Sequence, residues 1–526
     1  MKSRKIISIT LALITALFAV MSCIPTALAA EYQANGATYF TFTDGGIIAS
    51  EGTYDGYKIE GTSLTINDSG TYVLSGSCAD GSVKVKRGTT GVTLVLSGLT
   101  LTSSTTAPIA CNKSTEVRII VASGSVNALT DSAKNNDDNY PDNTYAENAV
   151  IKCKDGSQVT LSGSGTLNIT ANGKSGIKSG ATTDEEGEAQ MTISDLTLNI
   201  TASVNDAINA EQLLNVTSGN ITISAGDDAI HSDYILNIGS ENGEGPVINI
   251  KNCHGGLEAA TLNVYSGNIT IHASDDCLNA ANSDLSGYAF SINIYGGTLV
   301  MDTTSGDGVD SNGSLTISGG TLVVWSANTA DNQPLDADGT ITISGGTFDS
   351  TTADKEVVAA TTGSTTVAIS GGSFKHEVPK VQCADGYIPC ADAKNPGRFS
   401  VEPISEPVAR AEDALGVDKG TFSTVQDAIN AAGLGGKVTL LRDNGDYATV
   451  SRSIVIDGAG CRMKNLTVMS IAGVKIMNLR ADTVTVSANA KAELSGENVF
   501  TELVNNGARC EIIDGRYLSH TGSGTY

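Results

Sequence analysis

The sequence predicts an all-β fold, a parallel β-helix of stacked coils, and two observations carry this prediction. A corner motif recurs about every 21 to 31 residues between residues 176 and 338, and the segments between corners alternate apolar and polar residues. A repeat of that length is typical of a solenoid, because one unit is too small to bury its own apolar face and must stack on the next. The repeat therefore defines the fold.

Each corner combines acidic or amide residues with one aliphatic residue, a polar residue and a small residue. The clearest corners read NDAINA, DDAIHS, DDCLNA and GDGVDS, and a weaker GGLEA lies between the second and third. We expect the aliphatic markers to stack inward, coil upon coil. These markers are Ile177, Ile208, Ile230, Leu257, Leu278, Val309 and Leu335.

The segments between corners are predicted to be short strands. Runs such as SINIYGGTLVMD from Ser291 and SLTISGGTLVVW from Ser314 alternate with period two and are cut by Gly-Gly, which indicates strand, bend and strand. The stretch from residue 31 to 399 has no helical periodicity, so helical and leucine-rich repeats are excluded. We expect about three strands per coil, with coils about 4.8 Å apart.

Residues 1–29 have the features of a secretory signal peptide. Basic residues at the start precede an apolar run from Ile6 to Val20 and an Ala-Leu-Ala cleavage site. Cys23 ends a lipobox-like VMSC, so a lipid-anchored product is the alternative. No later segment is long and apolar enough to span a bilayer. We expect a secreted, extracellular protein, released or held at the cell surface by what it binds.

The charge of the chain excludes two classes of partner. Three of the 32 Lys and Arg lie in the leader, so the mature chain has 29 basic and 57 acidic residues and a net charge of −28. Nucleic acid and anionic membranes are therefore not expected partners. An acidic polysaccharide would also be repelled unless a divalent cation bridges the two surfaces.

Three regions are expected after the leader. Residues 30–373 form the main β-helix, residues 374–407 a linker, or seam, and residues 408–526 a smaller β-helix-like module. The module begins with FSTVQDAINAAG, in which Ser423 and Gln426 suggest a capping box and Gly433 a helix end. Val425, Ala428, Ile429 and Ala432 would share the buried face. This helix would cover an open end of stacked strands.

Nine cysteines remain after the leader, and their pairing stays open. Cys383 and Cys390 flank a short turn and are candidates for a local disulfide in an oxidising compartment. Cys111 and Cys153 sit in similar contexts and are candidates for a pair between coils. Buried free thiols are the alternative for both of these and for Cys277. The spacing does not suggest a zinc site.

Several long segments resemble a known family. SGTYVLSG from Ser69, VTLVLSGLTLTSSTTAPI from Val92 and SGSGTLNITANGKSGIKS from Ser162, with the NDAINA and GDDAIHS corners, are similar to extracellular carbohydrate-binding β-helix proteins of Gram-positive bacteria. The resemblance runs from about residue 64 to 348. It implies a right-handed, pectate-lyase-like β-helix that carries calcium and binds cellulose and acidic pectic polysaccharide such as polygalacturonate. The usual Asp-Gly of the corner is Asp-Ala at Asp206 and Asp228 and Asp-Cys at Asp276.

The corners are candidate calcium sites. The residue after each aliphatic marker should point outward and form a ladder, whereas the Asp two before it would point inward on a straight strand. Burying an unpaired carboxylate costs several kcal/mol, and Ca²⁺ takes six to eight oxygen ligands. The alternative is that these residues only form Asx-turns. The candidate ligands are Asp206, Asp227, Asp228, Asp275, Asp276, Asp307 and Asp310.

Binding of polysaccharide is favoured over catalysis. The candidate sugar-binding residues are the ladder members Asn209, His231, Asn279 and Asp310 and the matched tyrosines Tyr265 and Tyr295. A calcium-dependent lyase is the alternative, and it would need a base beside the metal, for which Lys174 and Lys178 are the candidates. A structural or adhesive surface protein is the second alternative.

Overall fold

The computed structural model describes residues 36–50, 52–180, 190–325, 333–350, 366–392, 394–403 and 407–526. The predicted leader and Cys23 lie outside these ranges. The described residues form two compact units. One contains residues up to Ile341 and Gly346–Thr366, and the other contains Thr342–Gly345 and Val367–Tyr526. In the part of the chain that is described, no helix has the length and apolar character needed to cross a membrane.

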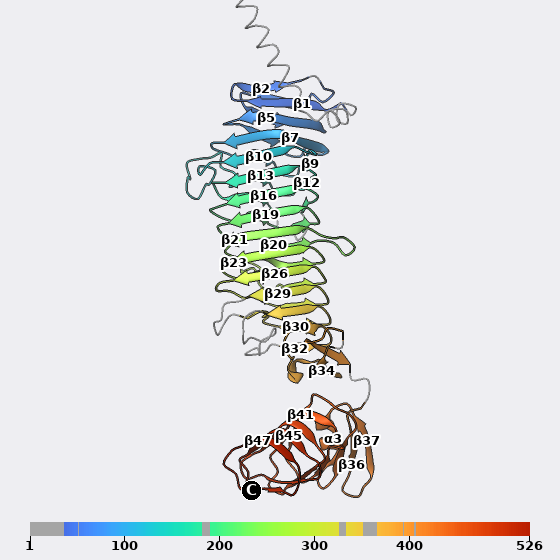
Figure 1. Cartoon of the computed structure of the whole chain (residues 1–526). Helices are drawn as coiled ribbons and strands as arrows, with labels where there is room; N and C mark the ends of the chain where they lie inside the picture. The colour runs from blue at the N-terminus through green and yellow to red at the C-terminus, as the bar shows by residue number, and fades with distance from the viewer. Residues whose placement is uncertain are drawn as a thin grey trace, which may run out of the picture. The chain divides into compact units, whose positions relative to one another are not determined.

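The first unit is a β-helix-like solenoid in which successive coils pair in parallel (Figure 1). Its strands fall into three rows, and each coil passes through them in turn. Row 1 contains the second part of β7 (Val92–Ser103), β10 (Val126–Asp131), β13 (Thr166–Ala171), β16 (Thr197–Ala202), β19 (Asn220–Ala225), β21 (Val247–Cys253), β23 (Asn268–Ala273), β26 (Thr298–Thr303), β29 (Thr321–Trp325) and β31 (Thr347–Ser350).

Row 2 follows the corners and is made of shorter segments. It contains β6 (Ser82–Val85), β8 (Ile109–Cys111), β11 (Ala149–Cys153), β14 (Ser175–Ser179), β17 (Ile208–Ala210), the first parts of β20 (Ile230–Ile238) and β22 (Leu257–Val264), β24 (Leu278–Ala280) and β27 (Val309–Ser311).

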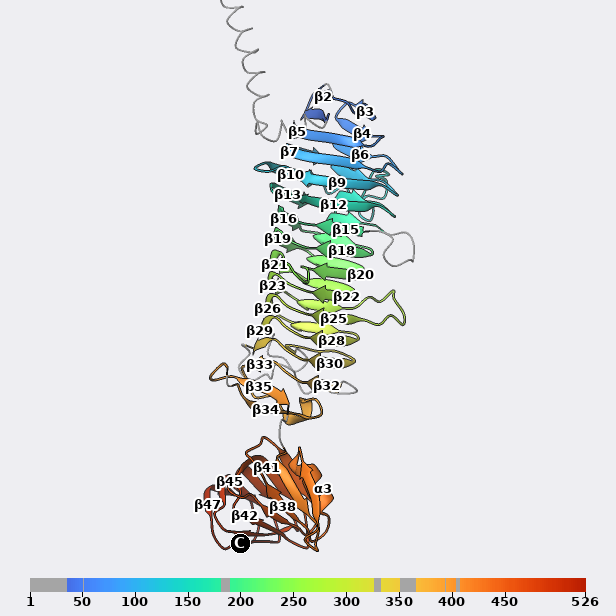
Figure 2. The ribbon, with the colours of Figure 1, turned by 90° about the vertical axis from the view of Figure 1, so that its right-hand side faces the viewer.

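Row 3 completes each coil before the chain turns back into row 1 (Figure 2). It contains β9 (Glu116–Val121), β12 (Gln158–Gly163), β15 (Gln190–Ile193), β18 (Leu213–Val216), the second parts of β20 and β22, β25 (Ser291–Ile294) and β28 (Ser314–Ile317).

The aliphatic markers form the predicted inward stack. Ile208 pairs with Ile230, which pairs with Leu257, and the register continues to Leu278 and Val309. All five side chains have no exposed surface. Burying one such side chain contributes about 1.5–3 kcal/mol, so one aliphatic residue per corner holds consecutive coils in register.

The start of the described chain forms two hairpins that precede the regular coils. β1 (Thr38–Thr43) pairs antiparallel with β2 (Gly46–Ala49) and parallel with β5 (Gly70–Cys78), and β3 (Tyr57–Glu60) forms a hairpin with β4 (Ser63–Ile66). Phe40 and Tyr72 are fully buried. These hairpins satisfy backbone groups that the first coil would otherwise expose at a sheet edge.

From Val367 onward the second unit contains the rest of β32 (Thr366–Ile369), β33 (Ser373–Phe374), the short 3₁₀ helix η1 (Lys380–Gln382), β34 (Tyr387–Ala391) and β35 (Phe399–Pro403). β35 pairs antiparallel with both β33 and β34. The segment expected to be a seam therefore carries a hairpin of its own.

Two further sheets and one helix complete the second unit. One sheet contains β36 (Ala409–Glu412), β37 (Asp418–Phe422), β38 (Lys437–Leu440), β40 (Val455–Asp457), β42 (Val474–Met477), β44 (Lys491–Ser495) and β46 (Arg509–Ile512). The other contains β39 (Tyr447–Val450), β41 (Arg462–Val468), β43 (Arg480–Val486), β45 (Val499–Asn505) and β47 (Arg516–Thr521).

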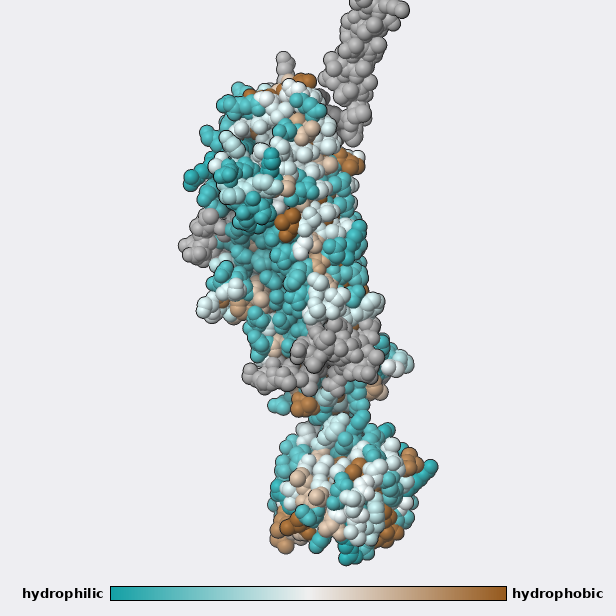
Figure 3. Space-filling model, turned by 90° about the vertical axis from the view of Figure 1, so that its left-hand side faces the viewer, coloured by the Kyte–Doolittle hydropathy of each residue, from teal (hydrophilic) through white to brown (hydrophobic). Residues whose placement is uncertain are grey.

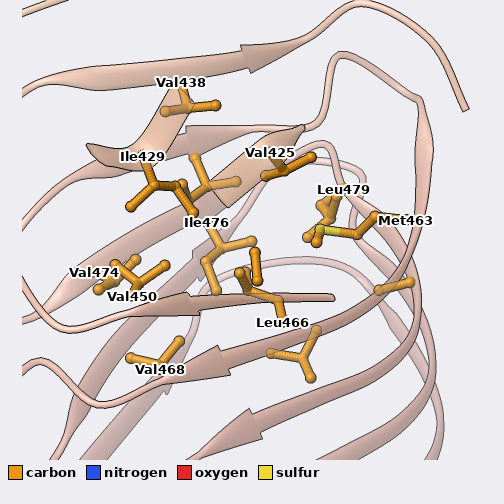
Figure 4. Packing of buried hydrophobic residues seen from close by; sticks show 14 of the residues in the cluster. Val425, Ile429, Val438, Val450, Met463, Leu466, Val468, Val474, Ile476 and Leu479 are labelled. Carbon is orange, nitrogen blue, oxygen red and sulfur yellow. The ribbon is translucent and has the colours of Figure 1, made fainter. Parts of the chain in front are cut away.

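Helix α3 (Val425–Ala432) packs against β36 and β38 with the predicted buried face (Figure 4). Gly433 follows it with φ 69°, as expected for a helix end. The predicted capping box at Ser423 and Gln426 is wrong by one residue. Thr424 is the N-cap, and its side chain accepts from the Asp427 amide. Gln426 instead bonds to the backbone of Thr449 on β39.

All nine cysteines from Cys78 onward are free thiols. The disulfide expected between Cys383 and Cys390 is absent. Cys390 Sγ lies 3.2 Å from Ser400 Oγ on β35, whereas Cys383 Sγ faces the Pro379 carbonyl at 3.8 Å. Cys111 and Cys153 are register partners on adjacent coils, as expected, but they remain thiols. A hydrogen bond to Cys153 and burial raise the pKa of Cys111.

Candidate functional site

The residues after the aliphatic markers form one continuous outward ladder along row 2. Lys178 pairs with Asn209, Asn209 with His231, His231 with Glu258, Glu258 with Asn279, and Asn279 with Asp310. We call this series the corner ladder and add Asp336, which follows the bridge between Val309 and Leu335. Figure 3 shows this side of the coil stack, where hydrophilic residues gather.

The Asp residues two before each marker have a structural role that the sequence did not reveal. Asp206 Oδ1 accepts a hydrogen bond from the Asp228 amide of the next coil at 3.2 Å. Asp276 Oδ1 accepts from the Asp307 amide at 2.6 Å, and Asp307 Oδ1 accepts from the Gln333 amide. Each carboxylate therefore ties one corner to the next and stabilises a backbone N–H that a bend would leave unpaired.

In the middle of the corner ladder the negative charge is balanced by a histidine. His231 Nδ1 lies 3.2 Å from Asp228 Oδ2 and 3.3 Å from Glu258 Oε1, and Nε2 lies 2.8 Å from Asp233 Oδ1. Burial lowers the pKa of His231, but hydrogen bonds to these three carboxylates raise it more, to about 12. These three carboxylates therefore favour the protonated ring, and Asp228, His231 and Glu258 also form a group that could hold a metal ion.

Further along the ladder three carboxylates meet with no such cation. Asp307, Asp310 and Asp336 each place an oxygen within 4.8 Å of the others, and all three are half-buried. Burial and the charges of Asp276 and the neighbouring carboxylates raise the pKa values of Asp307 and Asp310 to about 7. We call these three residues the acidic cluster.

A buried amide oxygen on the adjacent coil is also unused. Asn279 donates its Nδ2 to Glu258 Oε2 at 2.9 Å, while its Oδ1 is buried and accepts no hydrogen bond from the described residues. Asn279 pairs in register with Asp310. An amide oxygen beside carboxylates is a ligand that Ca²⁺ prefers.

The other predicted metal ligands lie outside the acidic cluster. Asp227 is exposed and approaches Asp228 and His254. Asp275 lies 3.8 Å from His254 Nδ1, and both side chains are about half exposed. Asp206 is buried, and burial with the charge of Asp228 raises its pKa to about 6. The structure therefore places the seven predicted ligands in several groups along the ladder.

The two lysines named as candidate bases both carry ion pairs. Lys178 Nζ lies 3.1 Å from Glu211 Oε1, and Lys174 Nζ bonds to Asp138 Oδ2 in the loop after β10. Lys152 is the register partner of Lys178 on the preceding coil. Burial and the charge of Lys178 lower the pKa of Lys152. The sequence indicates this position of Lys152, because Lys152 follows an aliphatic residue just as Lys178 does.

The two matched tyrosines lie at another turn of the coil. Tyr265 and Tyr295 follow β22 and β25, at the junction of row 3 with row 1, whereas the acidic corners join row 1 to row 2. Their rings stack with centroids 5.0 Å apart and planes 10° apart. The predicted aromatic ladder is thus present, but it is separate from the corner ladder.

These features define a β-rich solenoid with polar ladders on its outer face, and comparison with known proteins identifies its family. A family model described as a carbohydrate-binding domain-containing protein matches residues 60–355 and 241–386. The chain belongs to this family.

A relative and a solved structure are also similar to parts of the chain. A carbohydrate-binding domain-containing protein of Acetivibrio thermocellus is 33% identical over 124 residues, which is 23% of this chain and 42% of the relative. The chain thus spans less than half of that relative. The gadolinium derivative of a polysaccharide lyase-like protein from C. thermocellum is 23% identical, over 58% of this chain and 96% of that one, with a TM-score of 0.35.

Proposed function

We propose that this protein is secreted and binds acidic plant cell-wall polysaccharide, polygalacturonate in particular, through calcium held at the acidic cluster of a right-handed β-helix. Membership of a carbohydrate-binding family supports the ligand class. The acidic cluster is the observation that supports a bound metal, because three carboxylates converge there without a positive side chain among the described residues.

The residues of the acidic cluster fit calcium in the chemistry of their donor atoms. Their donors are carboxylate oxygens with an amide oxygen nearby, and hard oxygen donors suit Ca²⁺. Two carboxylates about 5 Å apart repel by about 3 kcal/mol at an effective dielectric near 20. A divalent cation would remove this repulsion and lower the raised pKa values of Asp307 and Asp310.

Calcium also explains how so acidic a surface could hold an acidic polymer. Residues 190–325 contain 15 Asp and Glu but a single basic residue, Lys251. A uronate chain would be repelled there unless its carboxylates share the metal with Asp307, Asp310 and Asp336. The ion supplies the bridging positive charge, while the corner ladder orients the chain across successive coils.

Retention on a polygalacturonate gel tests the proposal. We expect the wild type to be retarded in calcium and to elute freely in EDTA, and Asp310→Asn to lose most of the retardation. Asp284→Asn is the matched control, because Asp284 is exposed on a loop outside the acidic cluster. Equal retention with and without calcium would refute the proposed role of the metal.

The lyase alternative gains no specific support from the lysine geometry. Lys174 and Lys178 are both held in ion pairs, although Lys178 lies on the corner ladder. A lyase would release an unsaturated uronate that absorbs in the ultraviolet. Its appearance with calcium at alkaline pH, and its loss in a Lys174→Ala, Lys178→Ala variant, would replace the binding proposal with an enzymatic one.

A further inference from the structure

The second unit differs from the first in its balance of charge. Residues 407–526 contain 12 Lys and Arg and 13 Asp and Glu, whereas residues 190–325 contain 15 acidic residues and one lysine. The residues that the family model matches end at 386, so this module lies outside them. An anion is therefore repelled far less by the module than by the later coils of the first unit.

A groove crosses the outer face of the first sheet of this module, in which β38 and β42 are labelled in Figure 2. Its volume of about 360 Å³ lies within the range of about 300–1,000 Å³ that is typical of small-molecule sites. A Cβ added at Gly473, where φ is 97°, would lie 3.8 Å from the Cβ of Lys491. Small residues make up part of the lining, and these are Gly435, Ser453, Ala472 and Gly473.

Three cationic side chains from three successive strands of the sheet line the same groove. Lys475 lies on β42, Lys491 on β44 and Arg509 on β46. Lys491 and Arg509 are register partners, and neighbouring strands are about 4.8 Å apart. Their positive charges repel each other, and an anion placed between them would remove this repulsion.

The three cations differ in how they are paired. Lys475 Nζ lies 2.9 Å from Glu493 Oε1, and Arg509 Nη2 lies 2.6 Å from Glu511 Oε2. The amine of Lys491 is exposed and makes no ion pair or hydrogen bond within the part of the chain that the structure describes. With three cations and two carboxylates, the groove has a net charge of +1, and Lys491 is its unpaired cation.

We propose that this groove binds a phosphorylated sugar or polyol, with the phosphate between Lys491 and Arg509 and without a metal ion. Phosphate oxygens accept from the Lys491 amine and from the guanidinium N–H groups that Arg509 does not use for Glu511. Glu493 and Ser453 line the same groove and keep acceptor oxygens for the hydroxyl groups of the ligand.

A phosphate monoester suits this groove better than a uronate does. The monoester carries a charge of about −1.5 to −2 at pH 7, whereas a carboxylate carries a single charge. Arg509 already holds the carboxylate of Glu511, so a uronate would compete with that carboxylate on equal terms. The monoester has more charge and more acceptor oxygens for the same two cations.

This site goes beyond the proposed function, because it lies in the second unit and uses neither the acidic cluster nor calcium. A free sugar phosphate and a phosphate ester on a polysaccharide present the same group to Lys491 and Arg509. Glucose 6-phosphate represents the first source and a phosphorylated amylose the second. Binding of either supports the site, and the tighter of the two identifies the source.

Calorimetric titration of the full chain in excess EDTA tests the site. We expect saturable binding of glucose 6-phosphate and no binding of glucose. Lys491→Gln should weaken the binding at least about tenfold, because a hydrogen bond between two charged groups is lost. Lys419→Gln is the matched control, since Lys419 lies on β37 at the opposite edge of the same sheet. Because Lys491 is exposed, Lys491→Gln should leave the thermal midpoint unchanged.

Two further titrations test the assignment to phosphate and to Arg509. Glu511→Gln frees the guanidinium and removes a negative charge, so it should tighten the binding of glucose 6-phosphate. Unchanged or weaker binding by this variant would contradict the contact with Arg509. Glucuronate should bind more weakly than glucose 6-phosphate, and equal or tighter binding of glucuronate would overturn the assignment to phosphate.

The two proposals fail independently in this design. Asp310→Asn should bind glucose 6-phosphate as the wild type does, and Lys491→Gln should keep calcium-dependent retention on polygalacturonate. The phosphate site is refuted if the wild type binds neither glucose 6-phosphate nor the phosphorylated amylose, or if Lys491→Gln binds them as tightly as the wild type.

Discussion

At the scale of single residues, two carboxylate groups on the same ladder differ in how their charge is balanced. His231 supplies an internal cation to Asp228, Asp233 and Glu258, whereas Asp310 and its neighbours have no positive side chain in contact among the described residues. A protonated histidine lowers the need of its own group for a metal ion. The acidic cluster is the group whose stability should depend on calcium.

Removing the histidine should create a new need for a cation. We expect His231→Asn to lose about 2 to 4 kcal/mol of unfolding free energy, because it leaves three partly buried carboxylates uncompensated. Added calcium should restore part of the loss. His254→Asn is the control, since its side chain is 58% exposed, and it should change stability by less than about 0.5 kcal/mol. Equal stability of the two variants in denaturant titrations would contradict this account.

The acidic cluster predicts a pH dependence with a definite sign. The pKa values of Asp307 and Asp310 rise from 3.8 to about 7 on folding, so the folded chain holds more protons than the unfolded chain between these values. In EDTA the contribution of these groups to stability is therefore lost as the pH rises through this window.

Calcium needs ionised carboxylates, so its stabilising effect should be larger at about pH 8 than at about pH 5. Thermal unfolding midpoints with calcium and with EDTA at both pH values measure this. A calcium-induced shift of the same size at both pH values would show that the ligands are not the carboxylates whose pKa values are raised.

At the scale of elements, the corners connect coils through their carboxylates. Because Asp276 Oδ1 accepts the Asp307 amide, Asp276→Ala should cost about 1–3 kcal/mol of unfolding free energy. Asp276→Asn keeps the acceptor oxygen and removes a charge, and it should be neutral or stabilising at neutral pH. If Asp276 were a calcium ligand, Asn would reduce the calcium-induced shift in midpoint. We expect that shift to persist.

The sequence predicts the rows and the ladder better than it predicts their hydrogen bonds. Period-two alternation and one aliphatic residue per corner are sufficient for the inward stack and the outward order from Lys178 to Asp310. The acceptor role of Asp206 depends on a partner one coil away, and the number of residues per coil varies. The contact therefore cannot be predicted from sequence spacing alone, because it depends on how the coils stack.

The same limit applies to the cluster and to the first hairpins. The sequence proposes seven Asp ligands, but it omits Asp336 from that set, because Asp336 meets Asp307 only through the register of the next coil. β1 is short, and its burial comes from tertiary pairing with β5, whereas β2 joins β1 as its hairpin partner. Thr424 caps α3 in place of Ser423, because Thr424 has the extended backbone conformation from which its hydroxyl accepts the Asp427 amide.

At the scale of the whole molecule, the second unit carries its own core. Val425 and Ile429 of α3 pack with Val438, Ile456 and Ile476 on the first sheet of the module. A chain of about 120 residues with such a core is long enough to fold alone. We expect residues 407–526, expressed alone, to unfold cooperatively in urea and to show no calcium-dependent retention. A non-cooperative transition would contradict an independent module.

The charge of the first unit is distributed unevenly along its coils. Residues 36–180 contain 13 acidic and 11 basic residues, whereas residues 190–325 contain 15 acidic residues and Lys251. Calcium should therefore act on the later coils, where the acidic cluster lies and long-range attraction for a cation is strongest.

Calorimetric titration of calcium into the metal-free protein tests the central claim most directly. The account predicts saturable binding by the wild type and by Asp284→Asn, with the acidic-cluster site lost or weakened at least about tenfold in Asp310→Asn, because one carboxylate of three is removed. Indistinguishable calcium isotherms for the wild type and Asp310→Asn, or no binding by the wild type, would contradict it.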